Sequence, residues 1–204
     1  MVIKKSEFIT SVARAGDFLT SEKPIIAIAG KSNVGKSSFI NALAGKNKLA
    51  KTSNTPGRTR LINYFDFGEF ILADLPGYGF ADVSKTEKQK WGKLMEDFFA
   101  FTEIRHVFSL IDIRHKPTKD DMQMITYLYA YSLPFTLIAT KADKLGKSKI
   151  KPAVVDLASF IKVGVSDILP VSNDTKYGFT AVYDRLDKVL SVVEEDFDDD
   201  ETED

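Results

Sequence analysis

The sequence has no cysteine among its 204 residues. This absence excludes disulfide bonds and thiolate metal sites, and it fits a protein of a reducing compartment. Long hydrophobic runs are also missing, because no apolar run approaches the roughly 20 residues that a membrane-spanning helix needs. Residues 1–7 lead into no such run either. We therefore expect a cytoplasmic protein without integral membrane association.

Basic residues are missing from residues 194–204, where nine side chains are acidic. Without these nine acids, 28 basic residues face 20 acidic ones, so residues 1–193 carry a formal charge of +8 although the whole chain carries −1. We expect a disordered acidic tail that either only raises solubility or folds over the basic body. The basic body suits a polyanionic partner such as RNA.

The rest of the sequence alternates apolar, β-prone stretches with helical ones, which is the pattern of an α/β fold. The six strands that we expect are 24–29, 61–67, 70–73, 106–111, 135–139 and 168–171. The helices that we expect are 36–43, 86–101, 118–131, 153–162 and 179–193. A turn at Gly68 joins the second and third strands as a hairpin, so a mostly parallel sheet with helices on both faces gains one antiparallel edge strand.

Three segments lie outside this alternation. Residues 1–23 are expected to form an extension, an extra strand or short helix packed on the sheet, while residues 24–193 form one domain. Residues 46–60 are polar and basic and predict a long loop, which is usually functional when it lies beside an active site. A lysine-rich loop is expected before the helix at 153–162.

A glycine-rich turn from Gly30 to Ser37 follows the first strand and matches the pattern G-x-x-x-x-G-K-[ST]. Its glycines permit backbone angles at which N–H groups converge on a phosphate at a helix N-terminus. Lys36 supplies a positive charge to the β- and γ-phosphates, and the Ser37 hydroxyl is a ligand for Mg²⁺. The residues of this phosphate-binding loop, or P-loop, are Gly30, Lys31, Ser32, Asn33, Val34, Gly35, Lys36, Ser37 and Ser38.

A second motif follows the hairpin and consists of Asp74, Leu75, Pro76 and Gly77. Ligands of open α/β sheets bind at the carboxyl ends of the strands, so this motif is expected to meet the P-loop in one crevice. There Asp74 holds the metal through water, and the Gly77 amide senses the γ-phosphate. Taken alone, the motif also fits an ordinary Asp-Pro-Gly turn.

Base specificity is predicted for the motif that follows the strand at 135–139. A carboxylate at Asp143 accepts hydrogen bonds from N1–H and the amino group of guanine, which adenine does not offer. Lys141 lies across the base with its aliphatic stem and braces the P-loop. The residues of this base site are Thr140, Lys141, Ala142 and Asp143, with backbone contacts from Val171, Ser172 and Asn173.

These motifs give the chain a resemblance to the translation-factor-related GTPases, and most closely to the EngB family of bacterial ribosome-assembly GTPases. The similar segments are 30–38, 55–60, 74–79 and 140–143, and residues 112–115 also look like that family's strand-end sequence. The resemblance extends over nearly the whole chain except the acidic tail. It implies a Ras-like fold, binding of GTP or GDP with Mg²⁺, and slow GTP hydrolysis. It also implies a monomer that acts on a large ribosomal subunit precursor and its rRNA, and that is needed for normal cell division and septation.

The resemblance also implies roles for residues of the 46–60 loop. Thr59 matches the switch threonine that joins Ser37 on Mg²⁺, although Thr55 competes for that role. The nucleotide contacts that it adds are Gly57, Arg58, Thr59, Arg60 and Leu61. Lys36, Thr59 and Gly77 are then the catalytic residues. The segment 171–173 departs from the commoner Ser-Ala-Lys form, so only its backbone is assigned a role.

Tyr78 stands where Ras-like enzymes place the glutamine that orients the attacking water, so intrinsic hydrolysis is expected to be slow. Asn33 matches a P-loop asparagine that coordinates K⁺ in related GTPases, so K⁺ is expected to stimulate hydrolysis. Arg58 and Arg60 are alternative sources of positive charge.

Two other functions stay open from the sequence. A P-loop nucleotide kinase would need an acceptor pocket and a lid, and the motif at Asp143 argues against it. A membrane- or septum-associated GTPase that does not act on the ribosome would need an amphipathic or self-associating extension, and no basic amphipathic helix stands out.

Overall fold

The computed structural model describes residues 3–50, 61–79 and 84–191. Its core is one sheet with the strand order β1-β3-β4-β2-β5-β6-β7. The strands are β1 (Glu7–Val12), β2 (Ile25–Gly30), β3 (Ile62–Asp66), β4 (Ile71–Asp74), β5 (Ile104–Asp112), β6 (Phe135–Thr140) and β7 (Ile168–Pro170). Strands β4, β2, β5, β6 and β7 are parallel to their neighbours in that series, so their carboxyl ends lie at one edge of the sheet.

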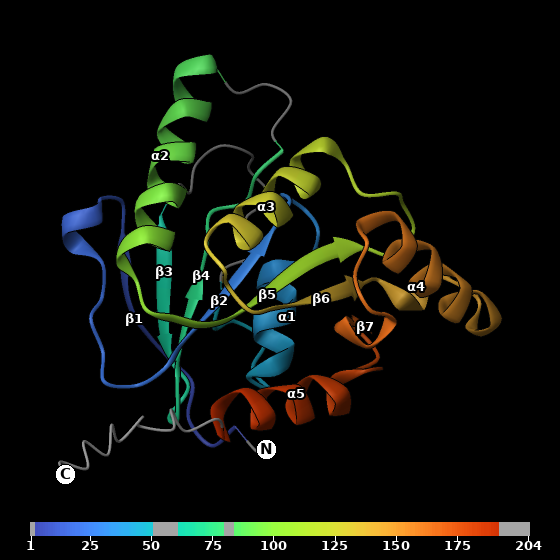
Figure 1. Ribbon diagram of the computed structural model, residues 1–204. Coiled ribbons are helices and arrows are strands. Elements are labelled where there is room, and N and C mark those ends of the chain that lie inside the picture. Colours follow the sequence, from blue (N-terminus) through green and yellow to red (C-terminus); the bar gives the residue numbers. More distant parts are fainter. Residues whose placement is uncertain (1–2, 51–60, 80–83, 192–204) are drawn as a thin grey trace, which may run out of the picture.

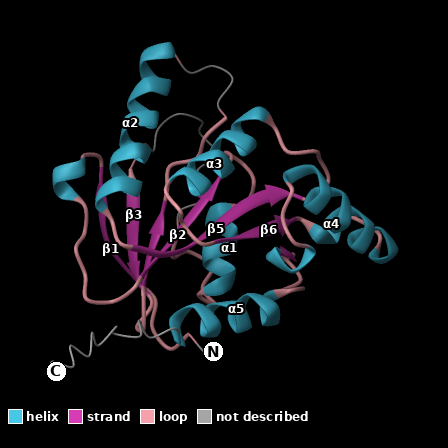
Figure 2. Ribbon diagram, viewed as in Figure 1, coloured by secondary structure: helices cyan, strands magenta, loops and turns pink. Residues whose placement is uncertain are grey.

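Helices cover both faces of this sheet (Figures 1 and 2). They are α1 (Lys36–Leu43), α2 (Lys85–Phe101), α3 (Lys119–Ala130), α4 (Lys147–Ile161) and α5 (Phe179–Ser191). Short 3₁₀ turns occupy Ala15–Asp17, Ala142–Lys144 and Val165–Asp167. Among the helices that the structure describes, none is long and apolar enough to cross a membrane.

Strand β2 shows why its sequence forms the centre of the fold. Its side chains alternate between the two faces, so Ile26 and Ile28 contact one hydrophobic cluster while Ala27 and Ala29 contact another. The first cluster contains the buried faces of α1 and α5, and the second those of α2 and α3. A third cluster joins α4 to β6 and the neighbouring part of α3. A strand buried on both faces reads as a continuous apolar run, as this one does.

The predicted fold class is confirmed, and the number of strands differs from the prediction. The sheet has seven strands rather than six, because residues 7–12 of the predicted extension form β1. Strand β1 pairs antiparallel with β3, which itself pairs antiparallel with β4. The antiparallel strand β3 is therefore internal, and β1 is the edge. The sequence of β1 mixes polar and apolar residues, and only its last residue, Val12, is buried.

Helix α4 also begins earlier than predicted. The expected lysine-rich loop is in fact the first turns of α4, which starts at Lys147 rather than at 153. Lysine is a good helix former, and the apolar positions Val154, Leu157, Ala158 and Ile161 already have helical spacing. Pro152 lies within this helix, where its missing N–H removes one backbone hydrogen bond.

A buried histidine on β5 makes the stability of the fold depend on pH. His106 is 5% exposed, and its Nε2 lies 2.9 Å from the Thr136 hydroxyl, which also accepts a hydrogen bond from Arg185. Burial first, and then the nearby Arg185 charge, lower the pKa of His106 from 6.5 to about 4. The ring is therefore neutral in the folded state at neutral pH.

We predict that His106→Gln removes a pH-dependent loss of stability. Above pH 6.5 both states hold a neutral ring, and between pH 6.5 and about 4 only the unfolded state takes up a proton. The free energy of unfolding of the wild type should therefore fall by about 3 kcal/mol more than that of the variant across this window. Urea unfolding at several pH values measures this difference. His115→Gln, at an exposed position, is the matched control; an equal change in both variants would contradict the prediction.

Candidate functional site

The predicted motifs meet at the carboxyl edge of the parallel strands. The P-loop follows β2, the segment from Asp74 to Gly77 follows β4, and the base-site motif follows β6. Ala142 N–H donates to Val171 O over 3.0 Å, which joins the base-site motif to the segment after β7. Leu61 precedes β3, whose first residues pair with the end of β4, so it lies at the same edge. Segments far apart in the chain thus form one site.

The backbone of the P-loop has the conformation that a phosphate cradle needs. Gly35 has φ +106°, and Asn33 has φ +63°. A Cβ on Gly30 would lie 2.8 Å from the Val34 side chain, so only glycine fits there without movement. Gly35 is the N-cap of α1 and makes no side-chain cap hydrogen bond, so the first N–H groups of α1 are available to an anion.

Four consecutive P-loop residues, Ser32 to Gly35, are each held by a hydrogen bond to another segment of the chain, which Ser32 donates and the other three accept. Ser32 N–H donates to Tyr78 O over 2.9 Å, and the Asn173 Nδ2 donates to Gly35 O over 3.2 Å. Between them, the Lys141 ammonium donates to Asn33 O and the Thr140 hydroxyl to Val34 O, each over 2.9 Å. We call these the four P-loop hydrogen bonds. They bring the second, base-site and last motifs into direct contact with the loop.

The charged centre of the site is the pair Lys36 and Asp74. The Lys36 ammonium lies 3.3 Å from Asp74 Oδ1, and the side chains are only 13% and 9% exposed. Apart from this ion pair, Asp74 Oδ1 is buried and accepts no hydrogen bond from the described residues. A buried carboxylate oxygen with room for a further donor fits a water ligand of Mg²⁺, and Ser37 lies in the first turn of the same helix as Lys36. The residues present therefore fit a nucleotide-bound Mg²⁺ ion.

The segment after Asp74 is packed against the P-loop at Gly77. A Cβ on Gly77 would lie 2.8 Å from Ser32 Oγ and 3.3 Å from Ser32 N, so a side chain would press on the loop. Trp91 of α2 holds the same segment from the other side, since its Nε1–H donates to Pro76 O over 3.1 Å. The segment from Pro76 to Gly77 therefore connects the P-loop directly to α2.

Tyr78 points away from the P-loop into the interface of α2 and α3. Its ring is 5% exposed and packs edge-on against Trp91, and its hydroxyl donates to Asp121 Oδ1 over 3.0 Å. Burial, followed by the charge of Asp121, raises the pKa of Tyr78 well above its ordinary value. Asp121 also closes the capping box of α3 with Thr118. Tyr78 therefore links the second motif to α3, and its hydroxyl is not placed to orient a water at the P-loop.

The base side of the site is organised by an acid that the sequence did not assign. Asp112, at the end of β5, lies 3.0 Å from the Lys141 ammonium and accepts two hydrogen bonds from the guanidinium of Arg114. Burial alone would raise the pKa of Asp112, but the hydrogen bonds from Arg114 and Lys141 outweigh it and lower the pKa below its ordinary value. Asp112 thus fixes the lysine that braces Asn33.

Asp143, the predicted specificity residue, and the last motif lie next to each other. Asp143 forms a 2.9 Å ion pair with Lys144, and hydrogen bonds from Lys144 and then Ser172 lower the pKa of Asp143. Its carboxylate is therefore ionised at neutral pH, as acceptance from guanine requires. The prediction assigned only backbone contacts to the segment from Val171 to Asn173, whereas the structure adds the side-chain hydrogen bond from Asn173 to Gly35.

Some predicted site residues lie outside the described part of the chain. They are Gly57, Arg58, Thr59 and Arg60, together with the alternative Thr55. The residues for which the sequence indicated no role in the site are Trp91, Asp112, Asp121 and the Asn173 side chain. A capping-box signal, Thr118 followed by Asp121 three residues later, was present in the sequence. This signal could have indicated the start of α3, but it does not encode the contact with Tyr78.

Comparisons with known proteins agree with this geometry. The sequence model of the family described as "50S ribosome-binding GTPase" matches residues 25–141. The "Probable GTP-binding protein EngB" of Mycoplasma mycoides is 43% identical over 195 residues, covering 93% of this chain and 98% of that protein. The protein of the same name from Clostridium kluyveri is 43% identical over 193 residues, with coverage of 93% and 98%.

Solved structures give the fold independently. The "Crystal structure of a probable GTP-binding protein engB" has a TM-score of 0.62 at 21% identity and covers 81% of this chain and 98% of that chain. The sheet, the P-loop and the three motifs around it define the class of the P-loop GTPases. Within this class, the chain belongs to the EngB family of 50S ribosome-binding GTPases. The resemblance seen in the sequence motifs is thereby confirmed.

Proposed function

We propose that the protein is a molecular switch that binds GTP with Mg²⁺, hydrolyses it slowly, and acts in assembly of the large ribosomal subunit. Its activity is needed for normal cell division and septation. The observation that carries the nucleotide part is the set of four P-loop hydrogen bonds, because they hold the base-site motif and the P-loop at a fixed separation. The ribosomal part is supported by the family to which the chain belongs.

The described residues have separate tasks in this function. The P-loop amides and Lys36 bind the phosphates, Ser37 binds Mg²⁺ directly, and Asp74 binds it through water. Asp143 selects guanine, and Lys141 supports the base while it braces Asn33. Bound Mg²⁺ neutralises phosphate charge as it develops during hydrolysis. Thr59, outside the described residues, is the proposed second protein ligand of the ion.

The switch depends on contacts that Gly77 makes on both sides. Its amide is proposed to bind the γ-phosphate, and its Cα lies against Ser32. Pro76 and Tyr78, on either side, are bonded to α2 and α3. Loss of the γ-phosphate therefore changes the forces on a segment that is tied to two surface helices. A ligand shifts such an equilibrium only by its differential affinity for the two states.

We predict that Asp143→Asn converts guanine specificity into xanthine specificity. Asparagine offers an amide N–H where the carboxylate accepted a hydrogen bond, and this N–H matches the extra oxygen of xanthine. Affinity for fluorescent GDP should fall by about a hundredfold, in line with loss of two charge-assisted hydrogen bonds, while a xanthine nucleotide gains affinity. Equilibrium titrations with ATP as a competitor measure this. Equal competition by ATP in the wild type would show that the site does not select guanine.

We predict that K⁺ stimulates hydrolysis through Asn33. Asn33 is exposed, its backbone is fixed by Lys141, and its side-chain amide has no hydrogen-bond partner in the part of the chain described. The amide oxygen is therefore free to coordinate a monovalent cation beside the phosphates, which adds the positive charge that hydrolysis needs. Phosphate release should be about tenfold or more faster in K⁺ than in Na⁺ at matched ionic strength. Asn33→Ala should lose this difference and keep its GDP affinity; similar rates of the wild type in both salts would contradict the prediction.

We predict that association with large ribosomal subunits depends on the bound nucleotide. Pelleting of the wild-type protein through a sucrose cushion with purified large subunits should be stronger with a non-hydrolysable GTP analogue than with GDP. A change of about tenfold in affinity corresponds to about 1.4 kcal/mol of differential binding to the two states. Small subunits are the control. Equal pelleting with GTP analogue and GDP would contradict the switch.

A further inference from the structure

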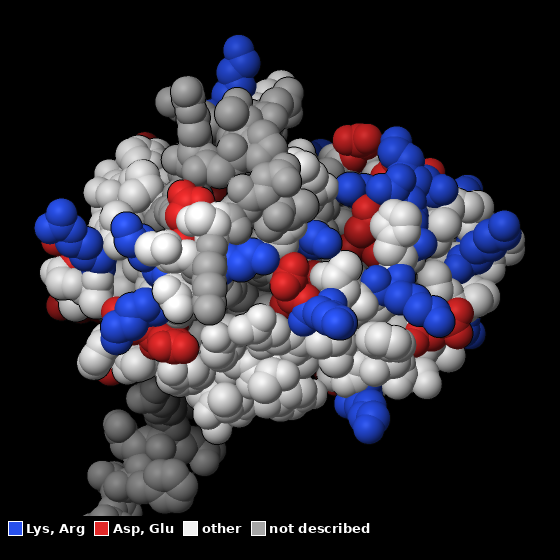
Figure 3. All heavy atoms as spheres, turned by 90° about the horizontal axis from the view of Figure 1, so that it is seen from above, with Lys and Arg blue, Asp and Glu red and all other residues white. Residues whose placement is uncertain are grey.

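The basic charge of the chain is concentrated on one helix and its flanks. Residues 141–162, which include α4, hold six lysines and two aspartates, a surplus of four positive charges. Residues 1–193 together carry +8. Figure 3, seen from above, shows Lys and Arg side chains gathered at the right side of the molecule, where α4 lies in Figure 1. The surplus of positive charge therefore lies on the side of the molecule formed by α4.

Most of these lysines are not used inside the protein. Lys147, Lys149, Lys151 and Lys162 are exposed, and none of them is in an ion pair within the described residues. Other lysines of the chain are paired, as Lys5 and Lys23 both contact Asp66. The ammonium groups along α4 are therefore available to an external partner.

The positions of Lys147 and Lys149 do not serve the stability of the helix. Lys147 and Lys149 lie in the first turn of α4, which contains no acidic residue and has Gly146 as an N-cap without a side-chain hydrogen bond. The helix dipole disfavours cations at this end. Helices α2 and α3 instead begin with complete capping boxes that contain Glu87 and Asp121. Unlike α2 and α3, helix α4 therefore carries cations at an end where they do not stabilise it, which points to a role of these lysines outside folding.

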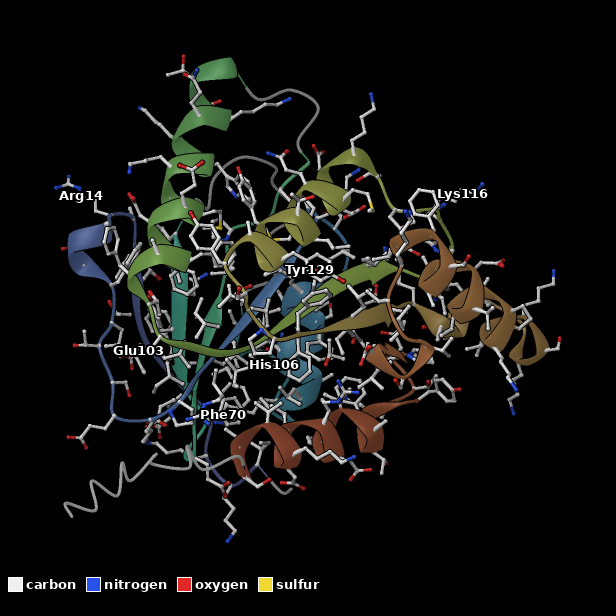
Figure 4. The ribbon with its side chains drawn as sticks, viewed as in Figure 1. Arg14, Phe70, Glu103, His106, Lys116 and Tyr129 are labelled. Atoms are coloured by element: carbon white, nitrogen blue, oxygen red, sulfur yellow. The ribbon has the colours of Figure 1, made fainter. Side chains whose placement is uncertain are left out.

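Two further lysines continue the same surface onto α3. Lys116 and Lys119 are exposed at the start of α3, and Figure 4 shows Lys116 on the loop that leads into this helix, directed away from the molecule. Ile125 of α3 and Leu157 of α4 belong to one hydrophobic cluster on the same face of the sheet. Their starting ends follow the adjacent strands β5 and β6, and therefore lie at the same edge of the sheet.

We propose that this surface binds the phosphate backbone of ribosomal RNA. We call it the α4 basic face and define it by Lys116, Lys119, Lys147, Lys149, Lys151 and Lys162. Helix α4 has 15 residues and is about 22 Å long. Lys147 and Lys151 lie one turn apart on the same side of its first turns, Lys149 lies on another side of the same turns, and Lys162 lies at the opposite end, so the exposed ammonium groups can contact separate phosphates of an RNA strand. Lysine acts as a point charge, which fits recognition of the backbone rather than of base sequence. The surface adjoins the base site through Lys144 and Asp143.

The packing of α4 favours RNA over an anionic membrane. A helix that inserts into the lipid interface needs a free apolar face opposite its cations. The apolar face of α4, formed by Val154, Leu157, Ala158 and Ile161, is buried in the protein. The exposed apolar side chains of the helix, Val155 and Phe160, are about half exposed and lie singly among polar residues. The face therefore offers charge without an insertion surface.

The test compares two triple variants of the full chain that lose the same charge. Lys147→Gln, Lys149→Gln and Lys151→Gln neutralise the α4 basic face, whereas Lys4→Gln, Arg14→Gln and Lys188→Gln neutralise exposed positions elsewhere. Figure 4 shows Arg14 on the opposite side of the molecule from Lys116. Binding is measured to a short RNA duplex by fluorescence anisotropy and to purified large subunits by pelleting, with the GTP analogue bound, between about 50 and 200 mM salt. GDP affinity and the thermal midpoint of each variant report correct folding.

The proposal expects the α4 variant to bind the duplex and the subunits at least about tenfold more weakly. Its salt dependence, the slope of log affinity against log salt, should be smaller by about 2 to 3, because three phosphate contacts are lost. The control variant should stay within about twofold of the wild type. Equal binding by the α4 variant, or an equal loss in both variants, would overturn the proposal.

The inference rests on the proposed ribosomal role, and the same data separate the two. Wild-type protein that binds subunits in a GTP-dependent way, with no loss in the α4 variant, overturns only the assignment of the face. Wild-type protein that binds guanine nucleotides but neither subunits nor duplex overturns the ribosomal role, and the face with it. Wild-type protein that pellets with phosphatidylglycerol vesicles but not with RNA assigns the face to lipid and overturns the proposal.

Discussion

The four P-loop hydrogen bonds are the interaction on which the site depends. The turn from Ser32 to Gly35 contains two residues with positive φ, which a free chain would seldom adopt together. A typical intramolecular hydrogen bond contributes about 1 kcal/mol, so bonds from Tyr78, Thr140, Lys141 and Asn173 together offset such a backbone cost. The four partners come from three strand ends, because Tyr78 follows β4, Thr140 and Lys141 stand at the end of β6, and Asn173 follows β7. The parallel sheet supports the loop because it delivers these strand ends to one edge.

The same bonds explain how the site connects to the surface. Tyr78 accepts from Ser32 with its backbone and donates to Asp121 with its side chain, so one residue contacts both the P-loop and α3. Pro76, two residues earlier, is bonded to Trp91 of α2. On the base side, Asp112 joins Arg114 to Lys141 and thus links the start of the loop before α3 to Asn33. Helices α2 and α3 are therefore connected to the site by hydrogen bonds.

Sequence patterns located the elements more reliably than they located the edges of the sheet. The strand after Pro24 and the helix from Lys36 to Leu43 were predicted from an unbroken apolar run and a glycine-rich turn, both local signals. The sequence of β1 fits either a strand or a short helix, because an edge strand buries only part of its side chains and shows no clear period. The start of α4 was misplaced, because its lysines are exposed and carry no apolar pattern.

The sequence by itself determined the nature of the chemistry. The order of glycine, lysine and serine in the P-loop, with Asp74 and Asp143 at strand ends, predicts a phosphate cradle, a metal position and a guanine acceptor, because each depends on residue type and local spacing. Only the tertiary structure decided which side chains hold these groups in place. These side chains are Asp112, Trp91, Asp121 and Asn173. Each forms a hydrogen bond or ion pair with a residue at least 15 positions away in the sequence, and no local pattern encodes such contacts. Their roles arise from the packing of strands and helices that are distant in the chain.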